Sequence, residues 1–168
     1  AFVSLNRNCS FYGTFTDRSA TPEQLRRQIR LDSNRFNRVE AMRRLTDIER
    51  IRLIQDIHAD ISNEWQEAFA HVLRDPSFPP GLKSYLLAID EQSLDRQYLP
   101  FYRERYAARM RLLRSVAARY TKDLLRIYED TDTYRPAAET KDGYEERKLK
   151  NVLLRTLIEA NTPDVHNL

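Results

Sequence analysis

The feature that most constrains the fold of this chain is an apolar seam in its second half. Between residues 100 and 128, apolar side chains recur in alternating steps of four and three residues. They are Tyr106, Met110, Leu113, Ala117, Tyr120, Leu124 and Ile127. Because an α-helix has about 3.6 residues per turn, these steps place all seven side chains on one helix face. The seam predicts one long amphipathic helix that other elements must cover.

The composition favours a mainly α fold around that helix. With 3 Gly and 7 Pro in 168 residues, the chain has few of the residues that turn-rich β folds and disordered linkers require. This length is typical of one domain, and 41% hydrophobic with 32% charged residues is typical of a globular protein. A lone Cys9 excludes an internal disulfide, and no apolar run could span a bilayer. We therefore expect a reducing, cytoplasmic setting.

Capping signals predict the other helices. A hydroxyl cap at Thr21, followed by proline and then by glutamine three residues after the cap, predicts a helix to about Leu31. Ser33 is expected to cap a second helix. Its apolar residues recur every three positions from 36 to 57, a row that would wind around a straight helix, so we expect a kink near Thr46. Further helices are predicted over residues 62–75, 80–89 and 144–160, with a loop at residues 131–136.

The first residues follow a different pattern. In residues 9–16 the side chains alternate with a period of two, which predicts a strand, and residues 2–5 predict a second strand of a hairpin. Two strands are marginal alone in water, so this hairpin needs a sheet from elsewhere or a cover of helices. The chain also begins with Ala1 rather than Met. We expect it to be a segment of a longer polypeptide.

No motif in the chain predicts catalysis. A hydrolytic zinc site requires two histidines one helical turn apart with a glutamate between them, but His58, His71 and His166 are widely separated. Cys9 has no local partner, and the serines lack the glycine-flanked turn of a nucleophile. We assign no catalytic residue, no metal ligand and no cofactor to this chain.

A cluster of arginines on the seam helix is the main electrostatic feature. Its members are Arg103, Arg105, Arg109, Arg111, Arg114 and Arg119, opposed only by Glu104, with Tyr102, Tyr106 and Tyr120 among them. At 100° per residue these arginines spread around the helix, whereas a nucleic-acid-binding helix concentrates them on one stripe. Tyr106 and Tyr120 are expected in the core. Ion pairing within the protein is the favoured interpretation, and a free-standing basic scaffold or nucleic-acid-binding module is the alternative.

Ordered short motifs resemble the aminopeptidase N family of zinc exopeptidases, of the bacterial alanyl aminopeptidase type among the gluzincins. Residues 4–11 and 32–41, with Phe36, Arg38 and Glu40, resemble the junction where a β-sandwich meets the C-terminal helical domain. Residues 65–76, 79–82, 112–128, 134–136 and 147–155 resemble successive motifs of that helical domain. The likeness departs from the family at residues 89–93, and Val39 stands where the family commonly has tryptophan.

The resemblance implies that residues 1–17 are the last strands of the β-sandwich. Residues 18–168 are then the first half of a C-terminal domain of stacked antiparallel helix pairs, of the helical-repeat or superhelix type. In that family the zinc ligands and the general base lie in a catalytic domain, over which the helical domain packs to limit the access of peptides.

The expected function is that of a non-catalytic fragment of a zinc-dependent aminopeptidase, a metalloprotease that removes N-terminal residues from peptides. Its partners are the catalytic and β-sandwich domains of the same polypeptide, and nucleic acid and membrane are not expected. Phe36, Arg38 and Glu40 are expected to be structural residues of the domain junction, and no substrate-binding residue is assigned.

Overall fold

A computed structural model describes residues 1–7, 19–90, 95–131 and 143–160 of the chain. Regular structure in these residues is helical. The elements in order are α1 (Pro22–Leu31), α2 (Arg35–Gln55), α3 (Asn63–Arg74), α4 (Pro80–Leu87), the short 3-10 helix η2 (Arg96–Tyr98), α5 (Tyr102–Asp130), α6 (Tyr144–Leu157) and the 3-10 helix η4 (Ile158–Ala160). The expectation of a mainly helical chain is confirmed.

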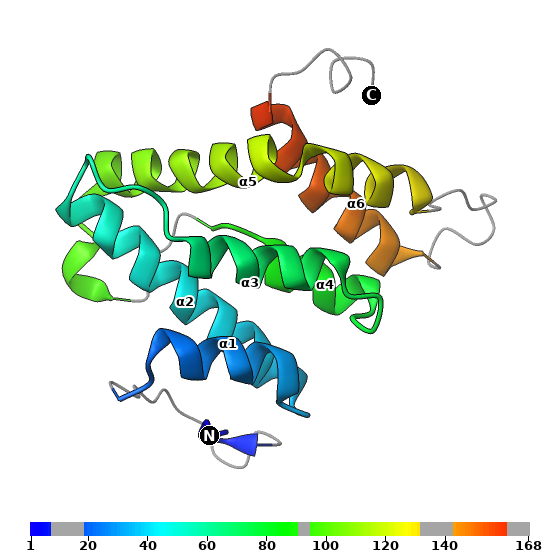
Figure 1. The fold of residues 1–168 in the computed structure, drawn as a ribbon, viewed down its shortest axis with the longest axis horizontal. Helices are drawn as coiled ribbons and strands as arrows, with labels where there is room; N and C mark the ends of the chain where they lie inside the picture. Colours follow the sequence, from blue (N-terminus) through cyan, green and yellow to red (C-terminus); the bar gives the residue numbers. More distant parts are fainter. Residues whose placement is uncertain (8–18, 91–94, 132–142, 161–168) are drawn as a thin grey trace.

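The helices are stacked in sequence order, as Figure 1 shows. Consecutive helices contact each other as the pairs α1 with α2, α3 with α4, and α5 with α6, and α2 also contacts α3. Helix α2 also packs against α4 and α5, and α4 packs against α6. The first pair lies at the N-terminal end of the molecule and the last at the C-terminal end (Figure 1), so each pair covers the apolar face of its neighbour, as in a helical-repeat protein.

The predicted β-hairpin is not found in the described residues. Residues 1–5 have no assigned strand, and the second predicted strand, at residues 9–16, lies outside the described residues. A strand is defined by its partner, so the absence of an assigned strand in residues 1–5 leaves the hairpin a prediction.

The start of α1 agrees with the prediction, and the start of α2 differs by one residue. Thr21 and Gln24 form a reciprocal capping box, in which the Gln24 amide oxygen accepts the Thr21 N–H at 2.9 Å. The cap of α2 is Asn34 and not Ser33, because the Asn34 side-chain oxygen accepts the N–H of Asn37 at 3.1 Å. The Asp32 carboxylate accepts the N–H of Asn34 at 2.9 Å, and this turn moves the helix start past Ser33.

The predicted kink near Thr46 is wrong, because α2 runs without interruption from Arg35 to Gln55. Helix α2 contacts α1, α3, α4 and α5, and Met42 and Leu45 of the winding row are buried, whereas Phe36 and Ile48 stay exposed. The Thr46 hydroxyl accepts a hydrogen bond from the Trp65 indole N–H at 3.0 Å. The Glu49 carboxylate accepts from the backbone N–H of Ser62, the cap of α3, at 2.8 Å. Thr46 and Glu49, which match a capping-box pattern, therefore bond to the first turn of α3 instead of capping a helix of their own.

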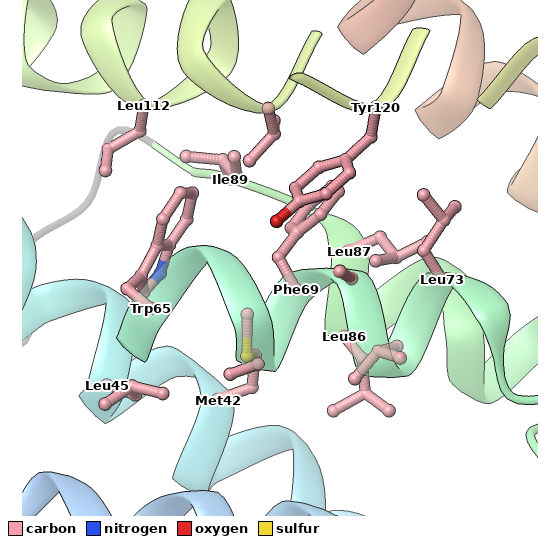
Figure 2. Close-up of a cluster of buried hydrophobic side chains, with 14 of the residues drawn as sticks. Met42, Leu45, Trp65, Phe69, Leu73, Leu86, Leu87, Ile89, Leu112 and Tyr120 are labelled. Atoms are coloured by element: carbon pink, nitrogen blue, oxygen red, sulfur yellow. The ribbon is translucent and has the colours of Figure 1, made fainter. Parts of the chain in front are cut away.

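The core is centred on α3 and is covered by α5. Figure 2 shows Tyr120 pointing from α5 toward Phe69, and Trp65 lying in the same cluster. Trp65 and Phe69 are among the largest fully buried side chains. The Tyr120 hydroxyl donates to the carbonyl of Gln66 at 3.2 Å. The first two turns of α3 are thereby fixed to α5 by both packing and a buried hydrogen bond.

The seam of α5 is buried in its middle and not at its first residue, Tyr106. Leu113, Ala117, Tyr120 and Leu124 are buried as predicted. Tyr106 is 46% exposed, so its expected place in the core is wrong. Arg111, one turn and a half later, lies beside residues 57–59, which precede α3, so Tyr106 lies beyond the end of that helix.

Helix α5 also contains a kink that the seam did not predict. Tyr120 leaves helical geometry with φ −122° and ψ 22°. The hydroxyl of the next residue, Thr121, donates to the Ala117 carbonyl at 2.6 Å, a type of bond that often accompanies helix bends.

The helices end without the glycine that usually turns a chain out of an α-helix. The residues that end α1, α2 and α3 are Asp32, Asp56 and Asp75, all in extended conformation. Each aspartate accepts the backbone N–H two residues later, at 2.9, 2.9 and 2.8 Å. This repeated turn explains how a chain with 3 Gly in total ends three helices sharply.

Cationic side chains from other parts of the chain satisfy carbonyls at or after these helix ends. Arg38 donates through Nε to the carbonyl of Ile29 and through Nη2 to that of Arg30, both at 2.7 Å. Lys83 donates to the Leu73 carbonyl at 3.1 Å, and Arg111 donates to the Ile57 carbonyl at 2.9 Å. These carbonyls lie where a helix leaves its own acceptors unpaired, and where the helix dipole favours a cation.

A Thr46→Val substitution is expected to destabilise the fold by about 1–3 kcal/mol, because it leaves the buried Trp65 N–H without an acceptor. Urea unfolding followed by circular dichroism measures the effect. In a Trp65→Phe background the same substitution is expected to cost less, since the donor is already gone. Equal costs in the two backgrounds would contradict the hydrogen bond.

An Arg38→Gln substitution is expected to cost about 2 kcal/mol, because charged hydrogen bonds to two carbonyls are lost. Arg103, an exposed arginine of α5, is a matched control, and Arg103→Gln is expected to change stability by less than about 0.5 kcal/mol. Thermal and urea unfolding compare the two variants. Equal losses of unfolding free energy in the two variants would show that the hydrogen bonds from Arg38 to the two carbonyls do not stabilise the fold.

The stability of the chain is expected to fall in acid through Glu49. Burial acts to raise the pKa of Glu49, but hydrogen bonds from Arg52 and Ser62 outweigh it and hold the pKa below its ordinary 4.5. Because the pKa of Glu49 is lower in the folded state than in the unfolded state, its ionisation stabilises the fold fully above pH 4.5. That stabilisation is lost as the pH falls through the folded-state pKa. Unfolding free energies measured from neutral pH to below 4.5 should decline less steeply for Glu49→Gln, and parallel declines would refute this role.

Candidate functional site

The three residues that the sequence assigns to a domain junction lie in the first two turns of α2. Arg38 points back to the end of α1, where its guanidinium also lies 4.4 Å from the centre of the Phe78 ring. Phe36 is 55% exposed. Glu40 forms an ion pair with Arg43 at 2.8 Å. Arg38 therefore bonds to the end of α1, whereas Phe36 lies on the surface, so the three residues do not form one cluster.

The N-terminal segment is attached beside these residues through Asn37. The buried Asn37 amide donates to the Ser4 hydroxyl at 2.9 Å and to the Leu5 carbonyl at 2.8 Å. Arg7 donates to the hydroxyl of Ser33 in the turn between α1 and α2. These bonds hold residues 4–7 against the start of α2. Asn37 thus fixes the N-terminal segment to α2, and sequence reasoning missed it because no pattern in the letters distinguishes a buried amide from an exposed one.

Asp32 is the charged centre of the turn between α1 and α2. Burial acts to raise the pKa of Asp32, but hydrogen bonds from Ser4 and from the N–H of Asn34 outweigh it and keep the pKa below 3.8. The amide of Gln28 also donates to this carboxylate at 3.0 Å. The carboxylate therefore stays ionised and links the N-terminal segment, α1 and α2.

A separate open groove of about 730 Å³ lies along α3 and α5. Its lining consists of Glu67, Ala70, His71, Arg74, Asp75, Arg119 and Tyr120. Burial lowers the pKa of His71, and the nearby Arg30 lowers it further. Arg74 donates to Asp123 at 2.7 Å, and Arg119 donates to Asn63 at 2.9 Å. The groove thus combines a histidine that favours its neutral form with arginines already bonded to neighbours, and it contains no nucleophile paired with a base.

The described residues do not provide a metal centre. No three or more His, Cys, Asp or Glu side chains among them lie close enough to hold a metal ion. His58 and His71 are described and lie apart in the chain, whereas Cys9 and His166 fall outside the described residues. The donor set that zinc requires is therefore not found in this part of the chain.

The arginines of α5 bind mostly backbone carbonyls and amide side chains rather than carboxylates. Arg109 donates to the Ile89 carbonyl at 2.8 Å and Arg111 to the Ala59 carbonyl at 2.5 Å. Arg119 donates to Asn63 and to Gln66. Arg114 forms an ion pair with Glu159 at 3.2 Å. The expected ion pairing therefore holds for Arg114, and the other three serve as connectors between helices.

These contacts weaken the alternative of a nucleic-acid-binding module. Phosphate binding needs guanidinium groups that are presented to solvent along one stripe. In α5, four of the six arginines are directed to four different parts of the protein. None of the helices that the structure describes is long and apolar enough to cross a membrane.

Comparisons with known proteins agree with this architecture. No curated protein matches the sequence. Eleven solved chains match the fold, among them the crystal structure of Legionella pneumophila aminopeptidase A in complex with aspartic acid. That match has a TM-score of 0.68 and 20% sequence identity, and it covers 90% of this chain but 19% of that chain. The likeness shows a shared fold, and it shows that this chain spans about a fifth of that protein's length.

The sequence comparison extends over nearly all of the helical region. Residues 22–168 match a family described as a domain of unknown function, DUF3458_C, with ARM repeats. The matched region begins at the first residue of α1 and includes every helix that the structure describes. Stacked helix pairs that contact their neighbours in order are the architecture of such repeats. The chain therefore belongs to the DUF3458_C family of ARM-repeat domains.

Proposed function

We propose that this chain is a non-catalytic C-terminal domain segment of a zinc-dependent aminopeptidase, an enzyme that removes N-terminal residues from peptides. The observation that carries the proposal is the structural match, in which 90% of this chain corresponds to 19% of an aminopeptidase chain. The ordered motifs of residues 32–41, 65–76 and 147–155, which resemble the aminopeptidase N family, support the same assignment. The proposal places the parent enzyme in the cytoplasm.

In the proposed enzyme the chemistry belongs to other domains of the same polypeptide. Zinc bound in the catalytic domain would supply an activated water for peptide hydrolysis. The helical segment packs on that domain and restricts the route by which peptides reach the site. Residues 1–17 are the last strands of a β-sandwich, and residues 18–168 begin the helical domain.

The internal bonds of the segment suit such a role. A domain that limits access must hold its shape when substrates collide with it, and relative motion is the default between domains that share a small interface. Here the N-terminal segment is fixed to α2 by Asn37, and α1 is fixed to α2 by Arg38. These bonds transmit the position of the preceding residues directly to the first helix pair.

The test compares two proteins in the release of p-nitroaniline from Ala-p-nitroanilide with added zinc. The complete polypeptide that contains this segment is expected to be active, and a chelator is expected to abolish that activity. The 168-residue chain is expected to be inactive under the same conditions. Turnover by the short chain comparable to that of a full aminopeptidase would overturn the proposal, and so would a complete polypeptide that hydrolyses no aminoacyl or peptide substrate.

A further inference from the structure

The surface around the turn between α1 and α2 exposes large apolar side chains next to arginines. Leu31, the last residue of α1, is 65% exposed, and Phe36, in the first turn of α2, is 55% exposed. Arg27, Arg30 and Arg35 are exposed beside them. We name these five residues the turn surface. In Figure 1 it belongs to the end of the molecule where α1 lies and where the N-terminus is found.

The turn surface faces outward because of the register of α1. The buried residues of this helix are Leu25 and Ile29. At 100° per residue, Arg27 lies directly opposite the midpoint of these two, and Arg30 and Leu31 lie to either side of it. The outer face of the first helix in the array is therefore formed by Arg27, Arg30 and Leu31. A polar outer face is what a terminal repeat needs in water, and Leu31 departs from that rule.

The arginines of the turn surface differ from those elsewhere in the fold. Arg38, which follows Leu31 by seven residues, donates to two carbonyls. Arg109 and Arg111 also donate to carbonyls. In contrast, the structure records no hydrogen bond or ion pair from the side chains of Arg27, Arg30 or Arg35 to any other described residue. Arg103 of α5 also has no recorded bond, but Arg27, Arg30 and Arg35 are three such arginines within nine residues of the chain, next to exposed Leu31 and Phe36.

The charges on this surface define the chemistry of what can cover it. Its three arginines are accompanied by one exposed carboxylate on the same face of α1, Glu23. The other carboxylate of the turn, Asp32, is buried and already accepts hydrogen bonds from Gln28 and Asn34. A partner that buries Phe36 must therefore bring carboxylates for the guanidinium groups, since a buried unpaired charge is costly.

We infer that the turn surface is the docking face for an acidic surface with an apolar centre on the domain that precedes this segment in the same polypeptide. Leu31 and Phe36 form the centre of the contact, and the three arginines form its rim. Aromatic side chains and arginines are enriched in protein interfaces, and Phe36 with the three arginines fits that composition. The inference rests on the proposed function, which supplies the preceding domain. Residues 4–7, bonded to Asn37 and Ser33, bring the preceding chain to this same surface.

Arginine footprinting with phenylglyoxal on the complete polypeptide tests the inference. Each arginine is followed by peptide mass spectrometry, so the reaction rates of Arg27, Arg30 and Arg35 are read separately. These rates are expected to be about tenfold or more below that of a free arginine peptide. Phe36→Ser is expected to raise them. The matched control Tyr144→Ser removes an aromatic of α6 that is 64% exposed, against 55% for Phe36, and is expected to leave them unchanged. Higher salt is expected to raise them as well, because rim ion pairs are screened.

The outcomes separate this inference from the proposed function and from other occupants. Rates equal to those of the free peptide, or rates that Phe36→Ser and Tyr144→Ser change alike, overturn the inference. Protection that disappears on dilution also overturns it, because a second copy would then cover the surface. Hydrolysis of Ala-p-nitroanilide is measured on the same sample. If the polypeptide is active but the arginines are unprotected, only the docking inference is contradicted. If the arginines are protected but the polypeptide is inactive, only the proposed function is contradicted.

Discussion

The fold depends on how its helix ends are satisfied. An α-helix leaves its last carbonyls without partners inside the helix, and many proteins turn the chain there with glycine in the left-handed conformation. This chain has 3 Gly, and α1, α2 and α3 end instead at an extended aspartate. The aspartate fixes the turn, but it leaves carbonyls that Arg38 and Lys83 must satisfy from another helix. A local property of the sequence thus becomes a bond between successive helices.

The same requirement explains why arginine is so common here. A guanidinium has several donors in a rigid planar fork, so one side chain can bond two carbonyls in adjacent positions, as Arg38 does with Ile29 and Arg30. Such bonds specify geometry more strictly than the burial of an apolar side chain does. Arg38 bonds the two helices of one pair, and Arg109 and Arg111 bond α5 to the segments that follow α4 and α2. Apolar burial then supplies most of the stability, through residues such as Trp65 and Phe69.

Local signals in the sequence predicted the helices well, whereas long-range contacts could not be read from it. The capping box at Thr21 and the proline after Asp75 act within one helical turn, and both predicted ends are found. Thr46 and Glu49 also have the letters of a capping box, but their partners are Trp65 and the start of α3. The letters are compatible with both structures. The choice between them depends on packing against a segment many residues away, and this is also why the exposure of Tyr106 and the bonds from Asn37 to Ser4 and Leu5 were missed.

The candidate site shows the same division in a stronger form. The resemblance implies a domain junction at Phe36, Arg38 and Glu40, and the structure places these residues in three different environments: exposed, bonded to α1, and paired with Arg43. Consecutive positions on a helix point in different directions, so one motif can contain both a residue that builds the fold and one that faces outward. Arg38 satisfies the last carbonyls of α1, whereas Phe36 is exposed in the part of the chain that the structure describes. The docking face proposed above would cover this aromatic side chain, which remains exposed beside a tightly bonded turn.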